Sequence, residues 1–207
     1  MVYDSGVRVF LETRRLVLRR FVAADIEHLV ELDSDPEVMR YLSGGAPTPR
    51  DAIESSILPR FLASYEKHAG LGFWAAINSD SHDFVGWFSL HPNDSAAAGD
   101  LELGYRLRRE SWGRGYATEG ARALLEVGFL TFGATRIFAA TYQDNLASRR
   151  VMEKLGMSFV RSFHITSAAV SGDTFVADES ALFEGDDVEY AITKAAWERS
   201  YPSCRPS

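Results

Sequence analysis

The stretch Ser111–Phe129 reads SWGRGYATEGARALLEVGF. It places Gly113 and Gly115 on either side of an arginine, directly after the β-rich segment Asp100–Leu107. Small or apolar side chains then recur at i, i+4, i+7, i+8, i+11, i+12 and i+15, which is one face of a helix. They are Ala117, Ala121, Leu124, Leu125, Gly128, Phe129 and Phe132. The glycines are therefore predicted to lie at the point where a strand ends and a helix begins.

A glycine pair at the start of a helix has two interpretations. The first backbone N–H groups of a helix are unpaired and carry partial positive charge, so glycines there let a phosphate approach them closely. Alternatively, the turn needs glycine for its conformation alone. The pattern is not a P-loop, because no Gly-Lys-Ser/Thr follows. It is not a dinucleotide fingerprint either, because Thr118 occupies the third glycine position.

Bulk composition limits the class of protein. The chain has 207 residues, 46% of them hydrophobic and 25% charged, with a formal net charge of -7. We expect one domain over residues 1–207 that binds neither nucleic acid, which needs a basic face, nor membrane. The single cysteine, Cys204, and the spacing of the histidines give no metal-ligand pattern. The N-terminus lacks the order of a secretory signal, so a cytoplasmic location is expected.

Periodicity and turn residues predict an alternating order of strands and helices. Strands are expected at 14–21, 72–78, 83–90, 100–107, 135–142, 157–165 and 188–193, and helices at 25–35, 36–42, 50–68, 117–129, 144–156 and, briefly, after 193. Asp25 is expected to cap the first helix, and Pro59 to kink or break the third. The acidic segment Thr166–Asp187 is too long for an ordinary connection and is expected to form a lid or an extended hairpin.

Several motifs together resemble the GNAT N-acetyltransferase superfamily. Its acyl-CoA loop has Arg or Gln, two residues, Gly, one residue, then Gly or Ala; here Gly115 and Ala117 fill the last two positions and Trp112 replaces the first. Trp-Gly-x-Gly-Tyr-Ala-Thr-Glu is similar to the ribosomal-protein N-terminal (RimJ/RimL-like) branch. NLASRRVMEKLGM, residues 145–157, resembles the signature Asn-x-x-Ser-x-x-Val-x-x-Lys-x-Gly. The resemblance implies an α+β fold: a mixed, mostly antiparallel sheet of about seven strands with helices on both faces.

The resemblance also implies acetyl transfer from acetyl-CoA to a primary amine, without a metal. The pyrophosphate is expected on the backbone of a six-residue loop: Gly113, Arg114, Gly115, Tyr116, Ala117 and Thr118. Arg114 or Arg109 would supply side-chain charge. The pantetheine arm is expected to pair with the strand that holds Leu103, Gly104, Tyr105 and Arg106, where Gly104 suits a bulge or a close approach. Asn145 is expected to contact the CoA arm, to cap the helix that follows, or both.

Two residues are the predicted catalytic groups. Ser148 shares a helix face with Met152 and Leu155, and the signature favours it as the proton donor to the departing CoA thiolate. The alternative is a hydroxyl bonded back to its own helix. Glu102 alternates with apolar strand residues and is the candidate base. It is otherwise a solvated or ion-paired residue, with water relaying the proton.

The acceptor is the least determined part of the prediction. The branch favours a peptide N-terminal α-amine; a small amine such as an amino acid, a polyamine or an aminoglycoside is the alternative. Trp74, Trp87, Phe88 and Tyr142 are candidates for the acceptor site or for the core. A non-catalytic acyl-CoA-binding module and a nucleotide-binding domain of another class are the competing functions. A homodimer is compatible with the sequence.

Overall fold

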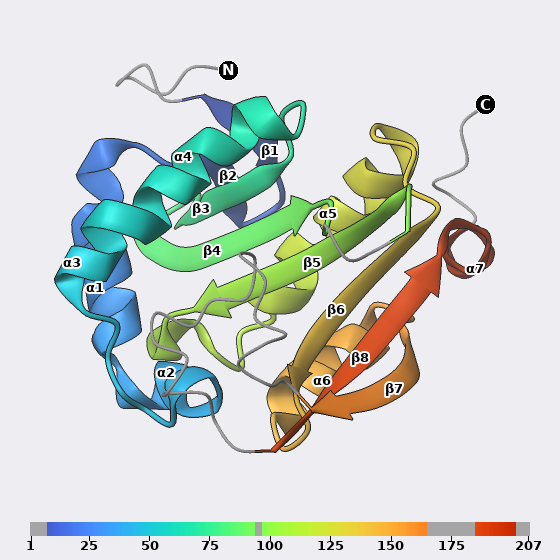
Figure 1. The fold of residues 1–207 in the computed structure, drawn as a ribbon. Coiled ribbons are helices and arrows are strands. Elements are labelled where there is room, and N and C mark those ends of the chain that lie inside the picture. The colour runs from blue at the N-terminus through green and yellow to red at the C-terminus, as the bar shows by residue number, and fades with distance from the viewer. Residues whose placement is uncertain (1–7, 94–96, 165–184, 202–207) are drawn as a thin grey trace.

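An eight-stranded sheet organises the molecule (Figure 1). The computed structural model describes residues 8–93, 97–164 and 185–201. The strand order is β1-β2-β3-β4-β5-β6-β8-β7. The bounds are β1 Val9–Glu12, β2 Leu16–Arg20, β3 Gly72–Asn78, β4 Phe84–His91, β5 Asp100–Leu107, β6 Arg136–Tyr142, β7 Ser158–His164 and β8 Asp186–Thr193. Neighbours are antiparallel except β5 and β6, which are parallel because the helix of the glycine motif connects them.

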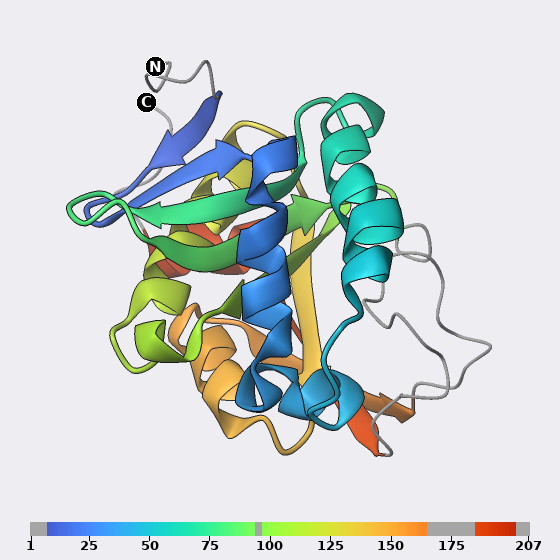
Figure 2. The same cartoon turned by 90° about the vertical axis from the view of Figure 1, so that its left-hand side faces the viewer.

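Helices cover both faces of this sheet (Figures 1 and 2). On one face lie α1 Ile26–Ser34, α2 Pro36–Ser43, and a continuous helical segment of α3 Arg50–Ala52, η2 Ile53–Ile57 and α4 Leu58–Lys67. On the other lie α5 Tyr116–Leu130 and α6 Leu146–Lys154, and α7 Lys194–Ser200 ends the described chain. The short turns are η1 Ala23–Asp25 and η3 Arg109–Ser111. Each face has its own core, with Phe61 and Trp87 on the first and Phe88 and Phe129 on the second.

The predicted fold is confirmed, with local differences. The additional strand is β1, which folds back on β2 through the turn at Thr13–Arg15. Pro59 does not break its helix. It lies in the first turn of α4, directly after the π-helical turn η2, and the wider hydrogen-bond spacing of that turn accommodates a residue without a backbone N–H. Asp25 stands at the start of α1, but its carboxylate makes no cap bond there and is instead paired with Arg19.

The long acidic segment is only partly within the described residues. Asp186 and Asp187 belong to β8, so the strand begins two residues before its predicted start. Residues 165–184, where a lid or hairpin was expected, lie outside the described residues.

The two parallel strands separate after a short ladder. β5 pairs with β6 from Asp100 to Glu102, opposite Arg136 to Phe138. β4 continues to pair with β5 as far as Leu107. Figure 1 shows β5 and β6 side by side where they start and apart where they end. The β6-facing backbone of β5 from Leu103 onward is therefore available to another extended chain.

Candidate active site

The glycine turn has the geometry of a helix entrance. Gly113 has φ 70° and Gly115, the N-cap residue of α5, has φ 83°. Both values lie in the left-handed region that disfavours side chains, so the conformational requirement for glycine is real. A Cβ on Gly113 would meet nothing within 4 Å. That open space leaves the N–H groups at the start of α5 approachable.

The turn is tied to the β1–β2 hairpin through Glu119, in the first turn of α5. Its carboxylate accepts from the Thr13 hydroxyl (2.7 Å), the Arg15 backbone N–H (2.8 Å) and Arg15 Nε (2.7 Å). Arg15 Nη1 also donates to the Arg114 carbonyl at 3.0 Å. Burial alone raises the pKa of Glu119, but these bonds outweigh it and lower the pKa. Glu119 therefore does more than interact with the helix dipole; it fixes the turn in place.

A cavity of about 1290 Å³ follows the gap between β5 and β6. It is lined by every residue of β5 from Glu102 to Leu107. Successive strand residues point to opposite faces of a sheet, so the cavity passes the edge of β5 from one face to the other. The α5–α6 face contributes the glycine turn and α6, and the α1–α2 face contributes Tyr41 and Trp87. Two molecules entering from opposite faces would meet beside β5.

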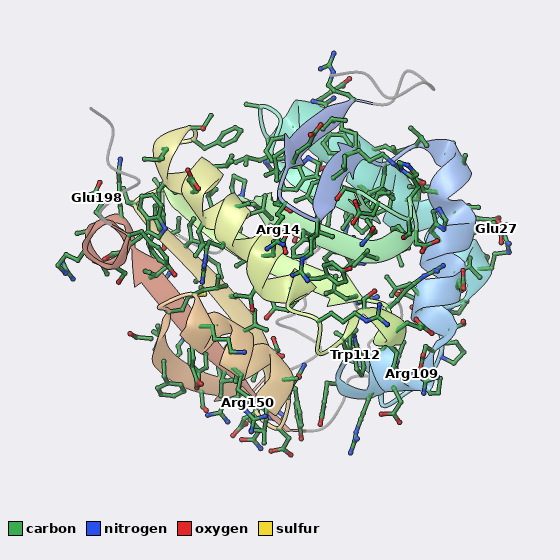
Figure 3. The ribbon with its side chains drawn as sticks, turned by 180° about the vertical axis from the view of Figure 1, so that it is seen from behind. Arg14, Glu27, Arg109, Trp112, Arg150 and Glu198 are labelled. Carbon is green, nitrogen blue, oxygen red and sulfur yellow. The ribbon has the colours of Figure 1, made fainter. Side chains whose placement is uncertain are left out.

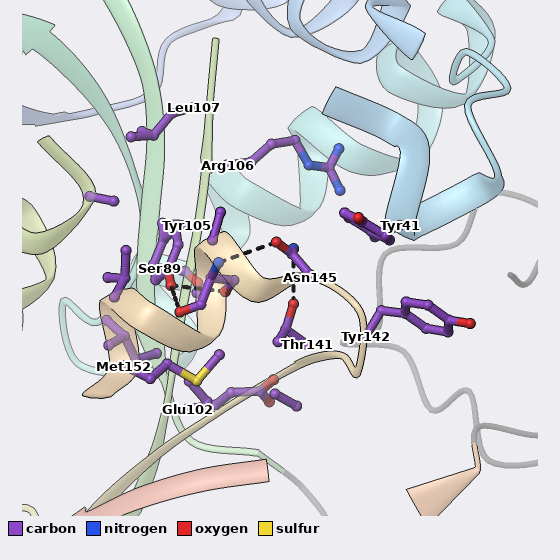
Figure 4. A pocket seen from close by; sticks show the side chains of 18 of the residues that line it. Tyr41, Ser89, Glu102, Tyr105, Arg106, Leu107, Thr141, Tyr142, Asn145 and Met152 are labelled. Carbon is purple, nitrogen blue, oxygen red and sulfur yellow. Dashed lines mark hydrogen bonds between the residues drawn. The ribbon is translucent and has the colours of Figure 1, made fainter. Parts of the chain in front are cut away.

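Two hydroxyl groups meet on the α6 side of this cavity (Figure 4). The oxygens of Tyr105 and Ser148 lie 2.9 Å apart, and the Tyr105 hydroxyl also approaches the Ser148 carbonyl at 3.3 Å. Asn145 caps α6 by accepting from the Ser148 N–H (3.2 Å) and donates to the Thr141 hydroxyl (3.1 Å). Burial raises the pKa of Tyr105 to about 12. The Ser148 hydroxyl thus finds its partner on another element of the fold.

Carboxylates and aromatic rings line the opposite side. Glu102 accepts from Asn93 Nδ2 at 2.6 Å. Burial, reinforced by the charge of Asp186, raises the pKa of Asp187 to about 6. Neither Glu102 nor Asp187 has an arginine partner within the described residues. The rings of Tyr41 and Tyr142, labelled in Figure 4, stack at 5.7 Å, and Tyr142 lies opposite Asp187 in the β6–β8 ladder. Such a wall suits a cationic group.

Arginines on this face are already paired. Buried Arg106 donates to Asp33 at 2.6 Å and lies over the Trp87 ring. Arg136 and Arg161 both bind Glu189. Their charges are compensated by these carboxylates, which leaves this side of the cavity acidic in character.

The predicted binding residues fall into two groups. Leu103, Tyr105, Gly113, Gly115, Tyr116, Ala117, Thr118 and Asn145 line the cavity, together with Ser148 and Glu102. Arg109 and Arg114 are not part of the lining; Arg109 Nε is paired with Asp35 at 3.2 Å. Figure 3 shows Arg109 and Trp112 beside the start of α5. Trp112 donates its indole N–H to the Leu107 carbonyl at 2.9 Å and so secures the turn after β5.

The structure shows whether Gly104 forms a bulge and which of the candidate aromatic residues line the cavity rather than the core. A Cβ on Gly104 would stand 2.5 Å from Ser89 Oγ, and the β4–β5 register is regular at this point. Gly104 therefore makes room for the Ser89 side chain and does not form a bulge; the close approach of the pantetheine arm stays a prediction. Trp87 and Tyr142 line the cavity, whereas Trp74 and Phe88 are fully buried core residues.

Sequence reasoning missed three side chains of the site. The Tyr105 hydroxyl was not singled out, because Tyr105 was grouped with the apolar face of its strand and was expected to bind CoA through the strand backbone. Arg150 is an exposed cation on α6 that lines the cavity, and Figure 3 shows it on that helix. His91 lines the cavity at the end of β4, directly opposite Glu102 in the ladder. The position of His91 at the end of a strand, together with period-2 alternation, was the signal that could have identified it.

Two other kinds of site are absent from the described residues. In the part of the chain that the structure describes, no three His, Cys, Asp or Glu side chains gather where they could hold a metal ion. None of the described helices has the length and apolar character needed to cross a membrane.

Comparison with known proteins places the chain in a family. Residues 15–158 match the acetyltransferase (GNAT) domain family. The chain is 31% identical over 196 residues to the FsC-acetyl coenzyme A-N(2)-transacetylase of Aspergillus fumigatus, covering 91% of this chain and 78% of that protein. A GNAT-family acetyltransferase from Bacillus anthracis has a TM-score of 0.70 at 25% identity, covering 90% of this chain and 99% of that one.

The chain therefore belongs to the GNAT acetyltransferase family and is an acetyl-CoA-dependent N-acetyltransferase. The ribosomal-protein-S5-alanine acetyltransferase of Vibrio fischeri has a TM-score of 0.67, with 90% of this chain and 97% of that one covered, at 16% identity. That likeness shows the shared fold alone, so the ribosomal-protein branch stays a prediction.

Proposed function

We propose that this enzyme acetylates the α-amine of an amino-acid unit in a ternary complex with acetyl-CoA. The observation that carries the proposal is the cavity that passes the edge of β5 and joins the glycine turn on one face to an acidic, aromatic wall on the other. Acetyl-CoA supplies the activated acetyl group. The protein's task is to hold amine and thioester together and to manage the protons.

The α5–α6 face is the proposed CoA side. The open N–H groups at Gly113–Thr118 suit the pyrophosphate, with Arg150 as a nearby cation that has no carboxylate partner within the described residues. The free edge of β5 from Leu103 suits the pantetheine arm, whose amides can pair with it as a strand would. Arg109 is committed to Asp35 and would have to leave that pair to reach a phosphate.

Ser148 and Tyr105 are proposed to stabilise the departing thiolate together. With its pKa raised to about 12, Tyr105 remains protonated and can donate to Ser148 Oγ. That bond leaves the Ser148 hydrogen free to point toward the sulfur. Because both hydroxyls hold their protons far more tightly than a thiol does, the pair acts by hydrogen bonding to the thiolate rather than by full proton transfer.

The acceptor side is proposed to receive a positively charged amine. Glu102 and Asp187, at separate points of the cavity, would attract the ammonium form, and the stacked Tyr41 and Tyr142 would border it on the Asp187 side. The name of the Aspergillus relative specifies N(2). In amino-acid nomenclature, N(2) is the nitrogen on the α-carbon. An α-amine has a pKa near ~8, against ~10.4 for lysine, so it needs a weaker base. A peptide N-terminus and a small amino-acid derivative both present this group.

A thiol-release assay with acetyl-CoA tests the proposal. The panel holds peptides with different N-terminal residues, amino acids and their amide or ester derivatives, polyamines and aminoglycosides. We expect turnover on α-amines and little on polyamines or aminoglycosides. Turnover on peptides alone would establish the N-terminal acceptor, and turnover on the free derivatives alone would establish the small-molecule one.

Binding is measured separately so that a missing acceptor is recognised. Acetyl-CoA at about 100 times its Kd should stabilise the fold by about 2.7 kcal/mol, while ATP and NAD should not. Stabilisation without turnover on any amine of the panel would overturn the α-amine acceptors tested and leave two options: an acceptor outside the panel or a non-catalytic acyl-CoA module. Turnover confined to polyamines would overturn the α-amine.

A further inference from the structure

The gap between β5 and β6 has an open end and a closed end. The glycine turn follows the end of β5 at Leu107, so the pyrophosphate of the proposed arrangement lies at the open end. At the other end, the parallel ladder of β5 and β6 holds the strands together as far as the pair Glu102–Phe138. A pantetheine arm that runs from the glycine turn along β5 therefore points its acyl group at the closed end. The side chains there limit the length of the acyl group.

The α6 helix runs toward the same closed end. β6 and β7 are both antiparallel to β8, so they are parallel to each other, and α6 is the helix that connects them. A helix that connects two parallel strands runs back along the sheet in the opposite direction. α6 starts beside the end of β6, where the Asn145 N–H donates to the Tyr142 carbonyl at 2.9 Å. It therefore leads from the open end of the gap to the closed one.

Met152 lies just beyond the proposed position of the thioester sulfur. The hydroxyls of Ser148 and Tyr105, 2.9 Å apart, mark that position. Met152 follows Ser148 by four residues, so it lies about one turn further along the same face of α6. Leu103 precedes Tyr105 by two residues and shares its face of β5. Figure 4 shows Met152 on the Glu102 side of Tyr105.

Met152 and Leu103 close the path of the acyl group. Both line the cavity, yet only 1% of Met152 and 2% of Leu103 are exposed. Both also belong to the core of the α5–α6 face, so close-packed side chains stand behind them. An acyl chain that extends past this point must therefore displace a core side chain. The unbranched side chain of Met152 is well suited to fill the space that remains beyond the thioester.

We propose that Met152 determines which acyl donor the enzyme uses, because it ends the acyl pocket at the size of an acetyl group. The inference rests on the proposed function, from which the path of the pantetheine arm comes. Each methylene beyond acetyl has to pack against Met152, and one methylene in a tight apolar pocket changes discrimination by about tenfold to 200-fold. Alanine at this position removes the side chain beyond Cβ, which leaves room for the two additional methylenes of a butyryl group.

Isothermal titration calorimetry with acetyl-CoA and butyryl-CoA tests this role without an acceptor. We expect the wild-type protein to bind butyryl-CoA about 100-fold more weakly than acetyl-CoA, and Met152→Ala to reduce this ratio to about tenfold or less. Met157→Ala is the matched control, since Met157 is a methionine of the same core, 4% exposed, that does not line the cavity. It should keep the wild-type ratio, because a loss of stability alone changes both affinities together.

Met152→Val, a smaller truncation, covers the case in which Met152→Ala does not fold, and it should give an intermediate ratio. Equal affinity of the wild-type protein for the two donors would overturn the inference, as would a Met152 variant that keeps the wild-type ratio. A wild-type protein that discriminates between the donors and yet turns over no amine of the panel would count against the proposed function instead, so the two failures are distinguishable.

Discussion

Tyr105 and Ser148 decide the leaving-group chemistry at the scale of single residues. Their oxygens are 2.9 Å apart although the residues are 43 positions apart in the chain. If they act as one hydrogen-bonded unit, Ser148→Ala and Tyr105→Phe should each lower kcat by about tenfold to 100-fold. The kcat of the double variant should be little lower than that of the poorer single variant, because the effects of two substitutions that remove one shared interaction do not add.

The control for this pair is Tyr190→Phe. Tyr190 Oη accepts from Arg149 Nε at 3.2 Å, so it also places a hydroxyl against α6, but it does not line the cavity. Its kcat should match wild type within a factor of two or so, since no hydroxyl at the reacting atoms is lost. Multiplicative losses in the double variant would show that Ser148 and Tyr105 act independently.

The start of α5 is the feature that matters at the scale of elements. Gly113 and Gly133 form a matched pair: their φ values are 70° and 68°, and a Cβ on either meets nothing within 4 Å. Alanine at either position should therefore cost about 1 kcal/mol of stability through backbone strain. Only Gly113 lines the cavity. We expect Gly113→Ala to weaken acetyl-CoA binding about tenfold and Gly133→Ala to leave it unchanged, by isothermal titration calorimetry.

This pair separates the two interpretations of the glycine motif. The structure shows that the turn needs glycine for its conformation. This conformational need exists whether or not a phosphate binds at the turn. Equal acetyl-CoA affinity in the two variants, with equal losses of stability, would leave the conformational interpretation alone standing.

Elements were predictable where their signal is local. The apolar stripe from Ala117 to Phe129 follows from helical spacing, and the strand Asp100–Leu107 from alternation. β1 was missed because four residues carry little periodicity and its pairing with β2 is decided by the turn between them. The meeting of Tyr105 with Ser148, and the position of His91 opposite Glu102 in the β4–β5 ladder, depend on strand register and on the separation of β5 from β6. No short-range pattern encodes those distances.

At the scale of the whole molecule, the mixed sheet makes the cavity possible. β4–β5 and β6–β8 remain paired while β5 and β6 part, so the sheet opens without exposing a complete edge. The opening also explains why carboxylates such as Asp187 can sit inside the structure. Their burial costs stability, and proteins accept that cost mainly at functional sites.

That cost can be measured through Asp187. Its pKa is raised from 3.8 to about 6 by burial and by Asp186, with His164 opposing. The folded state thus binds this proton more tightly than the unfolded chain does. The ionised carboxylate destabilises the fold fully above pH 6, and the penalty fades as the pH falls toward 3.8. Complete shielding would make the penalty about 3 kcal/mol; partial exposure reduces it to about 1 kcal/mol.

Asp187→Asn should therefore raise the free energy of unfolding by about 1 kcal/mol near pH 7.5, and by much less near pH 4, in urea titrations. Asp80→Asn removes the same charge at an exposed turn and should change stability little at either pH. If Asp187 also attracts the acceptor, the stabilised variant should have a higher KM for the amine. A variant that is less stable at both pH values would instead mean that the carboxylate supports the fold.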